Sequence, residues 1–197
     1  MQNNQLTTQN DNAAIFTERN AVAIQEVNRI MHTMAVPKEL KGKPEEIHSL
    51  VNIAMNLNVP VEATLANCHV IHGRVGFDAK FLIAIANRSG KLDRPLQFYM
   101  DETRNQWCYA IGYIGGHEYR GPAVTIQMAT AEKWNAKWRT IPELMLQYRA
   151  AAFFIRTVMP EVLMGAEFSD ELTDIYDTNK QPDPVDFTES YIEGEEI

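Results

Sequence analysis

The stretch from Trp138 to Asp174 constrains the fold more than any other part of the chain, because it specifies a long helix with defined ends. Thr140 and Glu143 have the spacing of a capping box, in which each side chain satisfies a backbone N–H of the first turn. Pro142 stands where its missing N–H costs nothing, and Pro160 cannot continue a helix. The sequence therefore predicts a helix that starts after Thr140 and ends just before Pro160.

Two arginines stand out on the surface of this predicted helix. Arg149 and Arg156 lie seven residues apart, so at 3.6 residues per turn they project in nearly the same direction, ~10 Å apart along the axis. Much of the remaining surface is apolar, from Leu144, Ala151, Phe154, Ile155 and Val158. We therefore expect one side of the helix to be held in a core and the other to offer guanidinium groups, which bind phosphates well.

The net charge of −8 is concentrated at one end of the chain. Residues 161–197 hold twelve acidic side chains and a single lysine, whereas residues 1–160 hold 17 basic and 14 acidic side chains. The body of the chain is therefore mildly basic. Because local charge governs counterion release from a nucleic acid, the acidic total does not exclude nucleic-acid binding.

The composition predicts a globular protein of the cytoplasm without contact to a membrane. No apolar run approaches the roughly 20 residues that span a bilayer, and the first residues lack the cationic and apolar regions of a secretory signal. The two cysteines, Cys68 and Cys108, are then expected to be reduced thiols rather than a disulfide.

The chain is expected to hold one folded domain between two disordered ends. Residues 1–12 are rich in Gln and Asn, and residues 178–197 are rich in Pro, Asp and Glu, so both are predicted to be disordered. The domain then covers residues 13–177. Its first part shows helical periodicity, which predicts helices over residues 14–34, from Pro44 to the residue before Pro60, and over 61–67.

The middle of the chain has the alternation of β-strands. Residues 68–71 and 75–77 flank His72-Gly73-Arg74 and read as a tight hairpin, after which Asp78 begins a helix that runs to Ser89. Three strands are expected over residues 96–100, 106–114 and 118–128, followed by short helices over 131–134 and after Ser169. Strands followed by helices of this kind indicate an α+β fold.

Several short motifs occur in an order and spacing that resemble the phage RecT family of single-strand annealing proteins. The resemblance covers roughly residues 45–174. The motifs that carry it are Val70–Arg74, Phe77–Lys80, Arg88–Lys91, Trp138, Pro142-Glu143, Met145, Arg149-Ala150, Arg156, Pro160, Gly165 and Asp170–Leu172. One departure is that Leu146-Gln147-Tyr148 stands where better-known members carry a lysine-rich run.

The resemblance implies a fold and a function. The fold is a helical N-terminal part followed by a curved antiparallel sheet, hairpin plus three-stranded meander, backed by the long C-terminal helix. The function is ATP-independent binding of single-stranded DNA and annealing of complementary strands in phage or prophage homologous recombination and DNA repair. No covalent bond is made, so the protein is not expected to be an enzyme. The resemblance also implies self-assembly into rings or helical filaments, with a phage exonuclease and the host single-strand DNA-binding protein as further partners.

The DNA contacts are expected mainly at phosphates, because annealing leaves the base edges free. No cofactor is expected, although magnesium ions between phosphates remain an alternative. The candidate residues are Arg74, Lys80, Arg88, Lys91, Trp138, Tyr148, Arg149 and Arg156. The alternatives are that the basic residues merely solubilise the surface and that Trp138 is a packing anchor.

Other chemistries find less support in the sequence. The P-loop pattern of an ATP-driven recombinase is absent. The spacing of Cys68, His69, His72, Cys108 and His117 matches no zinc finger or ribbon. The remaining alternatives are a single-strand coating module without annealing activity, a phage structural or partner-docking protein, and a metal nuclease. The acidic tail is expected to keep the protein soluble, or else to compete with DNA or dock a partner.

Overall fold

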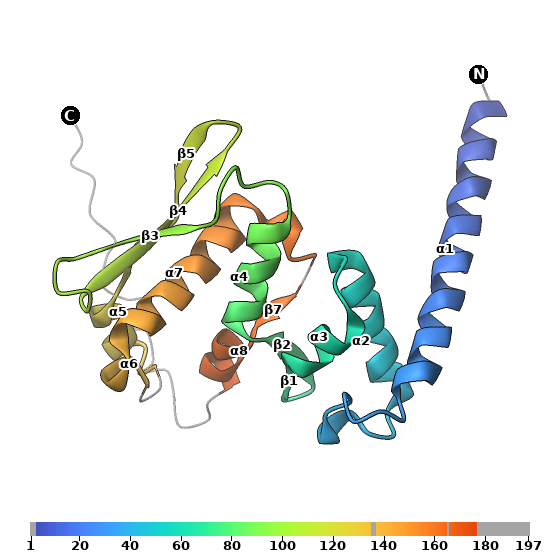
Figure 1. Cartoon of the computed structure of the whole chain (residues 1–197), viewed down its shortest axis with the longest axis horizontal. Helices are drawn as coiled ribbons and strands as arrows, with labels where there is room; N and C mark the ends of the chain where they lie inside the picture. The colour runs from blue at the N-terminus through green and yellow to red at the C-terminus, as the bar shows by residue number, and fades with distance from the viewer. Residues whose placement is uncertain (1–2, 135–136, 165, 177–197) are drawn as a thin grey trace, which may run out of the picture.

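The computed structural model describes residues 3–134, 137–164 and 166–176, and it has an α+β fold (Figure 1). Helices α1 (Asn3–Ile30), α2 (Pro44–Leu57) and α3 (Val61–Ala66), with a 3-10 turn at Lys38–Leu40, form the N-terminal part. Two small sheets and the remaining helices form the rest. No helix of the described residues is both long and apolar enough to cross a membrane.

Helix α1 extends from one end of the molecule, and its C-terminal half packs against the rest of the N-terminal part (Figure 1). Ala23, Val27 and Ile30, which recur at helical spacing, are buried there against the rest of the N-terminal part. The helix begins at Asn3 rather than near residue 14, so it includes most of the segment predicted to be disordered. No apolar stripe marks that first part, and this is why periodicity did not find it. The predicted tail, 178–197, lies outside the described residues.

The hairpin forms a sheet of its own. Strands β1 (Cys68–Ile71) and β2 (Arg74–Phe77) pair antiparallel, and the turn between them places His72 and Gly73 at φ of 49° and 80°, as a type I′ turn requires. Strand β7 (Glu167–Phe168) adds to β2 in parallel. The expectation of one antiparallel sheet is therefore wrong. A two-residue strand shows no alternation, so the sequence held no signal for β7.

The second sheet contains the meander. Its order is β3 (Gln97–Met100), β4 (Trp107–Ile114) and β5 (His117–Arg120), and β6 (Val124–Thr125) also pairs with β4. The third predicted strand, over 118–128, is interrupted after Arg120, resumes as β6, and is wrong from Ile126 onward, where a helix begins. Pro122 has no N–H for a ladder, and the Thr125 hydroxyl accepts a bond from Met128 N, which starts helix α5 (Ile126–Ala131).

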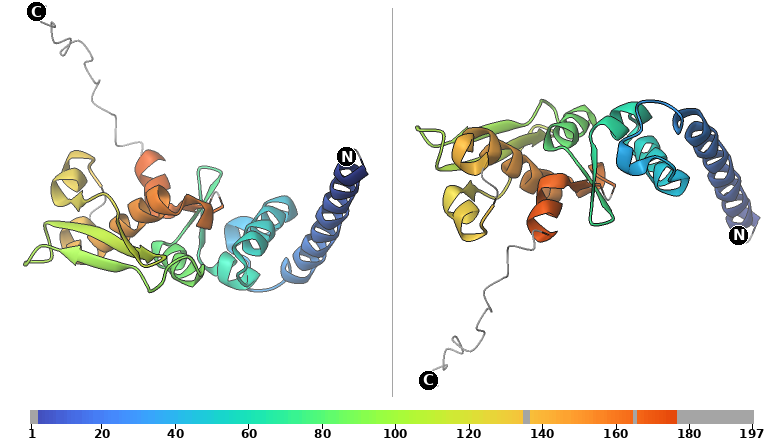
Figure 2. Two further views of the ribbon diagram at one scale, coloured as in Figure 1. Left: turned by 90° about the horizontal axis from the view of Figure 1, so that it is seen from above. Right: turned by 90° about the horizontal axis from the view of Figure 1, so that it is seen from below.

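Helix α7 (Pro142–Val158) lies across one face of the second sheet (Figures 1 and 2). The approach is close because Gly112 of β4 has no side chain: a Cβ there would lie 2.4 Å from the Phe154 ring. Helix α4 (Ala79–Arg88) packs beside α7, and no described helix covers the opposite face of the sheet (Figure 2). The long helix behind the meander is thus present as predicted.

The start of α7 differs from the prediction. Thr140 closes helix α6 (Lys137–Thr140), Ile141 takes the N-cap position of α7 without a side-chain cap, and Glu143 pairs with Arg104 at 3.1 Å. The capping box is therefore not formed, although Pro142 begins the helix as expected and Val158 ends it just before Pro160. Helix α8 (Ser169–Tyr176) follows β7.

Candidate nucleic-acid interface

Most of the predicted basic contact residues are paired with carboxylates. Arg88, at the end of α4, instead donates to the carbonyl oxygen of Asn58. The exposed ion pairs between these residues and carboxylates contribute about 0–1 kcal/mol each, so they can exchange partners at small cost, whereas the Arg149–Glu171 pair is largely buried. The pairs are Arg74 with Glu167, Lys80 with Asp78 (3.3 Å), Lys91 with Glu161, and both Arg149 and Arg156 with Glu171.

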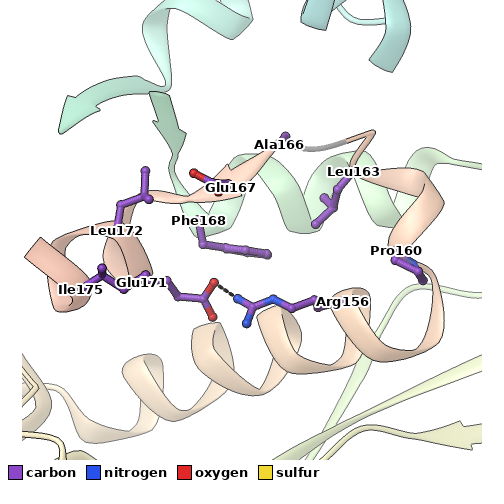
Figure 3. A pocket seen from close by; sticks show the side chains of 9 residues that line it. All are labelled: Arg156, Pro160, Leu163, Ala166, Glu167, Phe168, Glu171, Leu172 and Ile175. Carbon is purple, nitrogen blue, oxygen red and sulfur yellow. Dashed lines mark ion pairs between the residues drawn. The ribbon is translucent and has the colours of Figure 1, made fainter. Parts of the chain in front are cut away.

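The two arginines of α7 meet at one carboxylate. Arg149 Nη1 lies 3.8 Å from Glu171 Oε1, and Arg156 pairs with the other oxygen, as Figure 3 shows. Their common direction agrees with the seven-residue spacing. The expectation that both guanidinium groups are offered to solvent is wrong for Arg149, whose residue is only 7% exposed. Burial, and then repulsion from Arg149, lower the pKa of Arg156.

Aromatic residues enclose the inner arginine. The Arg149 guanidinium lies 4.1 Å from the centroid of the Trp134 ring, and the Trp134 and Trp138 rings are 4.7 Å apart. Trp138 is buried, so it serves as a packing residue, the alternative role given for it above. Tyr148, on α7, is half-buried against the core. The buried Trp138 ring has no open face for base stacking, whereas Tyr148 stays a candidate for DNA contact.

A pocket opens beside Arg156 (Figure 3). It has a volume of about 490 Å³ and is bounded by α7, the turn after it, β7 and α8. The walls are largely apolar, and the Arg156–Glu171 ion pair forms its charged part. More than half of the Arg156 side chain, 53%, remains exposed. The lining residues are Arg156, Pro160, Leu163, Ala166, Glu167, Phe168, Glu171, Leu172 and Ile175.

The uncovered face of the second sheet carries a row of aromatic rings. Side chains alternate along a strand, and Cys108, Ala110 and Gly112 of β4 are buried on the side of α7. The residues between them therefore face the other way. The Trp107 and Tyr109 rings are parallel within 4° at 5.8 Å, and Tyr99 of β3, directly opposite Tyr109, stacks on it at 5.6 Å.

Two arginines flank this row. Arg120 of β5 lies 5.8 Å from the Tyr109 ring centroid, and Arg94 lies 3.5 Å from that of Tyr113, farther along β4. Arg120 also pairs with Glu118, which accepts a hydrogen bond from the Tyr113 hydroxyl, and these contacts lower the pKa of Glu118. Within the described ranges, Arg94 has no carboxylate within ion-pairing distance. We call Tyr99, Trp107, Tyr109, Tyr113, Arg94 and Arg120 the aromatic face.

Sequence reasoning missed the aromatic face, although a signal was present. Trp107, Tyr109 and Tyr113 stand at even spacings in one predicted strand, which places them on one side. What the sequence did not show is that α7 takes the other side. Nor did it show that Tyr99 comes into register with Tyr109.

The carboxylate of Asp101 fixes the hairpin that presents Trp107. Its Oδ1 accepts bonds from Gln106 N (2.9 Å) and Trp107 N (3.1 Å), and its Oδ2 accepts from Thr103 N (3.0 Å) and the Thr103 hydroxyl. The Thr103 hydroxyl bond first, and then the backbone bonds, hold the pKa of Asp101 well below its usual value. The ionised form is thus the one that the fold uses.

The replacement Asp101→Asn is expected to lower the melting temperature at neutral pH. It should also make the melting temperature fall less steeply as the pH is lowered. Because the folded-state pKa lies below the unfolded value, the wild-type carboxylate stabilises the fold above about pH 4, and that stabilisation is lost as the pH falls further. The melting temperatures of the two proteins, measured from pH 7 to pH 3, should therefore converge on the acid side. Parallel curves would contradict this role.

The possible metal ligands and the two cysteines can be placed in the part of the chain that the structure describes. Within the three described ranges, no three His, Cys, Asp or Glu side chains are grouped so that they could hold a metal ion. Cys68 and Cys108 are free and buried, and burial raises the pKa of their thiols to about 11 and about 12. Such thiols behave as small apolar residues.

The arrangement of the aromatic face suits a flat, conjugated ligand with an anionic backbone. Parallel rings provide stacking surface, and guanidinium groups provide charge for phosphates.

Comparison of the chain with protein-family models, with curated proteins and with solved structures finds no match in any of the three.

Proposed function

We propose that this protein binds single-stranded DNA without ATP and anneals complementary strands, in phage or prophage homologous recombination. The observation that carries the binding is the aromatic face. Base stacking on aromatic side chains stabilises single-strand complexes by about 1–3 kcal/mol per base and tolerates any sequence. Many domains that bind single-stranded nucleic acids use a sheet of this kind, in which one face packs on helices and the other carries aromatic residues that stack on bases.

The aromatic face fits annealing as well as binding. A base that stacks on Tyr99 or Trp107, which lie on either side of Tyr109 in the row, uses its flat surface, so its pairing edge stays available to a second strand. Arg94 and Arg120 would bind phosphates on either side of the rings. These roles require no covalent step, in keeping with a protein that is not an enzyme.

The annealing activity, the biological setting and the partners rest on the resemblance of the sequence motifs to the RecT family. They include assembly of copies into rings or filaments, and a phage exonuclease and the host single-strand DNA-binding protein as partners. The candidate contact residues predicted from the sequence remain candidates where they are accessible. Arg74, Lys80, Arg88, Lys91 and Arg156 are exposed.

The test is annealing of two complementary labelled oligonucleotides without ATP, with and without magnesium, at several salt concentrations. Wild type should accelerate duplex formation. The double substitution Arg94→Gln/Arg120→Gln should reduce the slope of log affinity against log salt by about 1.4, because each phosphate contact with a single strand contributes roughly 0.7. The matched control, Lys38→Gln/Lys41→Gln, removes equal charge from exposed residues near α2 and should leave the slope unchanged.

The outcomes separate the alternative functions. Salt-sensitive binding without faster annealing would identify a coating module. Absence of binding at low salt would overturn the proposal and favour a structural or partner-docking protein. Magnesium-dependent degradation of the oligonucleotides would indicate a nuclease.

A further inference from the structure

We infer that the Glu171 carboxylate occupies a phosphate-binding site on α7, and that α8 is a displaceable cover which single-stranded DNA must replace to reach Arg149 and Arg156. This inference rests on the proposed function and adds its regulation. The site differs from the aromatic face, since α8 and the second sheet lie on different sides of α7 (Figure 2).

The first argument is the geometry of the two arginines. Two guanidinium groups, two turns apart on a rigid helix, converge on one carboxylate, at 3.8 Å for Arg149 and in direct contact for Arg156. A carboxylate and a phosphate present similar oxygen pairs to a guanidinium. The Trp134 ring, whose centroid lies 4.1 Å from the Arg149 guanidinium, gives the inner arginine a second contact that does not depend on α8.

The second argument is that Glu171 is an imperfect ligand for this site. Its Oε1 is buried and accepts no hydrogen bond within the described part of the chain, which carries a desolvation cost. The outer arginine is reachable from solvent through the adjoining pocket of about 490 Å³ (Figure 3). An incoming phosphate can therefore contact Arg156 before α8 has moved away.

The third argument is that the whole C-terminal part of the described chain neutralises basic residues. Glu161 pairs with Lys91 and Glu167 pairs with Arg74, as Glu171 does with the arginines of α7. Strand β7, which leads into α8, is attached to β2 by only two paired residues. Displacement of β7 and α8 would thus release Arg74, Arg149 and Arg156 together, and each is a potential phosphate contact.

The attachment of α8 also offers a way to loosen it without changing any charge. Gly76 of β2 lies directly under α8, and a Cβ at this position would lie 2.7 Å from Ser169 Cα and 2.9 Å from Leu172 Cδ1. Replacement Gly76→Ala therefore pushes against the helix backbone while Glu171 and both arginines stay intact.

The experiment measures dissociation constants of the full-length protein for an oligothymidylate over a range of salt concentrations. Glu171→Gln should bind roughly three- to tenfold more tightly at low salt, with a slope steeper by about 0.7 for each additional phosphate that the protein binds. Gly76→Ala should change affinity in the same direction. The double variant Glu171→Gln/Arg156→Gln should lose most of this increase in affinity. Thermal melting of each variant shows whether it is folded.

The matched control is Asp170→Asn, which makes the same change in net charge one residue earlier on α8, away from the arginines. If Glu171→Gln and Gly76→Ala are folded and match this control in affinity and slope while the wild type binds DNA, the cover is refuted and the proposed function stands. If the wild type fails to bind at low salt but Glu171→Gln binds, the cover is supported and the proposed function of the wild type is refuted. If no variant binds, both fail.

Discussion

Replacement of two rings of the aromatic face, Trp107→Ala/Tyr109→Ala, is expected to weaken binding of single-stranded DNA by roughly 10²-fold or more. Each lost stacking contact with a base costs about 1–3 kcal/mol, and a tenfold change in affinity corresponds to about 1.4 kcal/mol. The two rings stack on each other at 5.8 Å and on Tyr99, so their effects should not be additive. Annealing should fall in parallel with binding.

Two comparisons make this prediction specific. Tyr119 of β5 lies opposite Gly112 in the register, on the other side of the sheet, and is 43% exposed, so Tyr119→Ala should leave DNA affinity almost unchanged. Trp107→Phe/Tyr109→Phe keeps two rings and should retain most of the affinity. Fluorescence anisotropy with a labelled oligonucleotide measures all three. Equal losses in the Tyr119 and double variants would argue against the aromatic face as the binding surface.

The largest effect on stability is expected where α7 crosses β4. Phe154 is fully buried, and the space that its ring occupies exists because Gly112 has no Cβ. Gly112→Ala should lower the free energy of unfolding by about 3 kcal/mol through overpacking, and Phe154→Ala by about 3–5 kcal/mol through the cavity that it leaves. Urea unfolding followed by circular dichroism gives both values.

The double variant Gly112→Ala/Phe154→Ala tests whether the close approach of position 112 to the Phe154 ring causes the loss of stability in Gly112→Ala. Removal of the ring makes room for the new methyl group, so the double variant should lose at least about 1 kcal/mol less than the sum of the single losses. Strict additivity would show that the two residues do not act on one another, and would place the cost of Gly112→Ala elsewhere in the strand.

Local sequence signals predicted the elements that they can describe. Pro142 and Pro160 bounded α7, and His72-Gly73 specified the tight turn of the hairpin. Local signals did not predict the elements whose formation depends on contacts between distant parts of the chain. Nothing near Glu167 indicates that two residues will join β2 in parallel, and Thr140 lost its expected capping role to a short helix before α7.

In the candidate site, too, the sequence predicted local features but not the contacts between distant residues. The spacing of Arg149 and Arg156 gave their common direction, but not what they face. The partner, Glu171, lies on a separate helix and buries the inner arginine. The alternation of aromatic residues in β4 defined one side of the strand, and only the structure shows that α7 packs on the other side.

The second sheet also bears on how copies of the chain can associate. Strand β5 has only four residues, all of them exposed, and two are the charged Glu118 and Arg120. Short, charged edge strands resist backbone pairing with a neighbouring molecule. A continuous β-ladder through this edge is therefore disfavoured, and contacts between copies on this side must depend on side chains. The same property protects the β5 edge of the sheet from edge-to-edge aggregation.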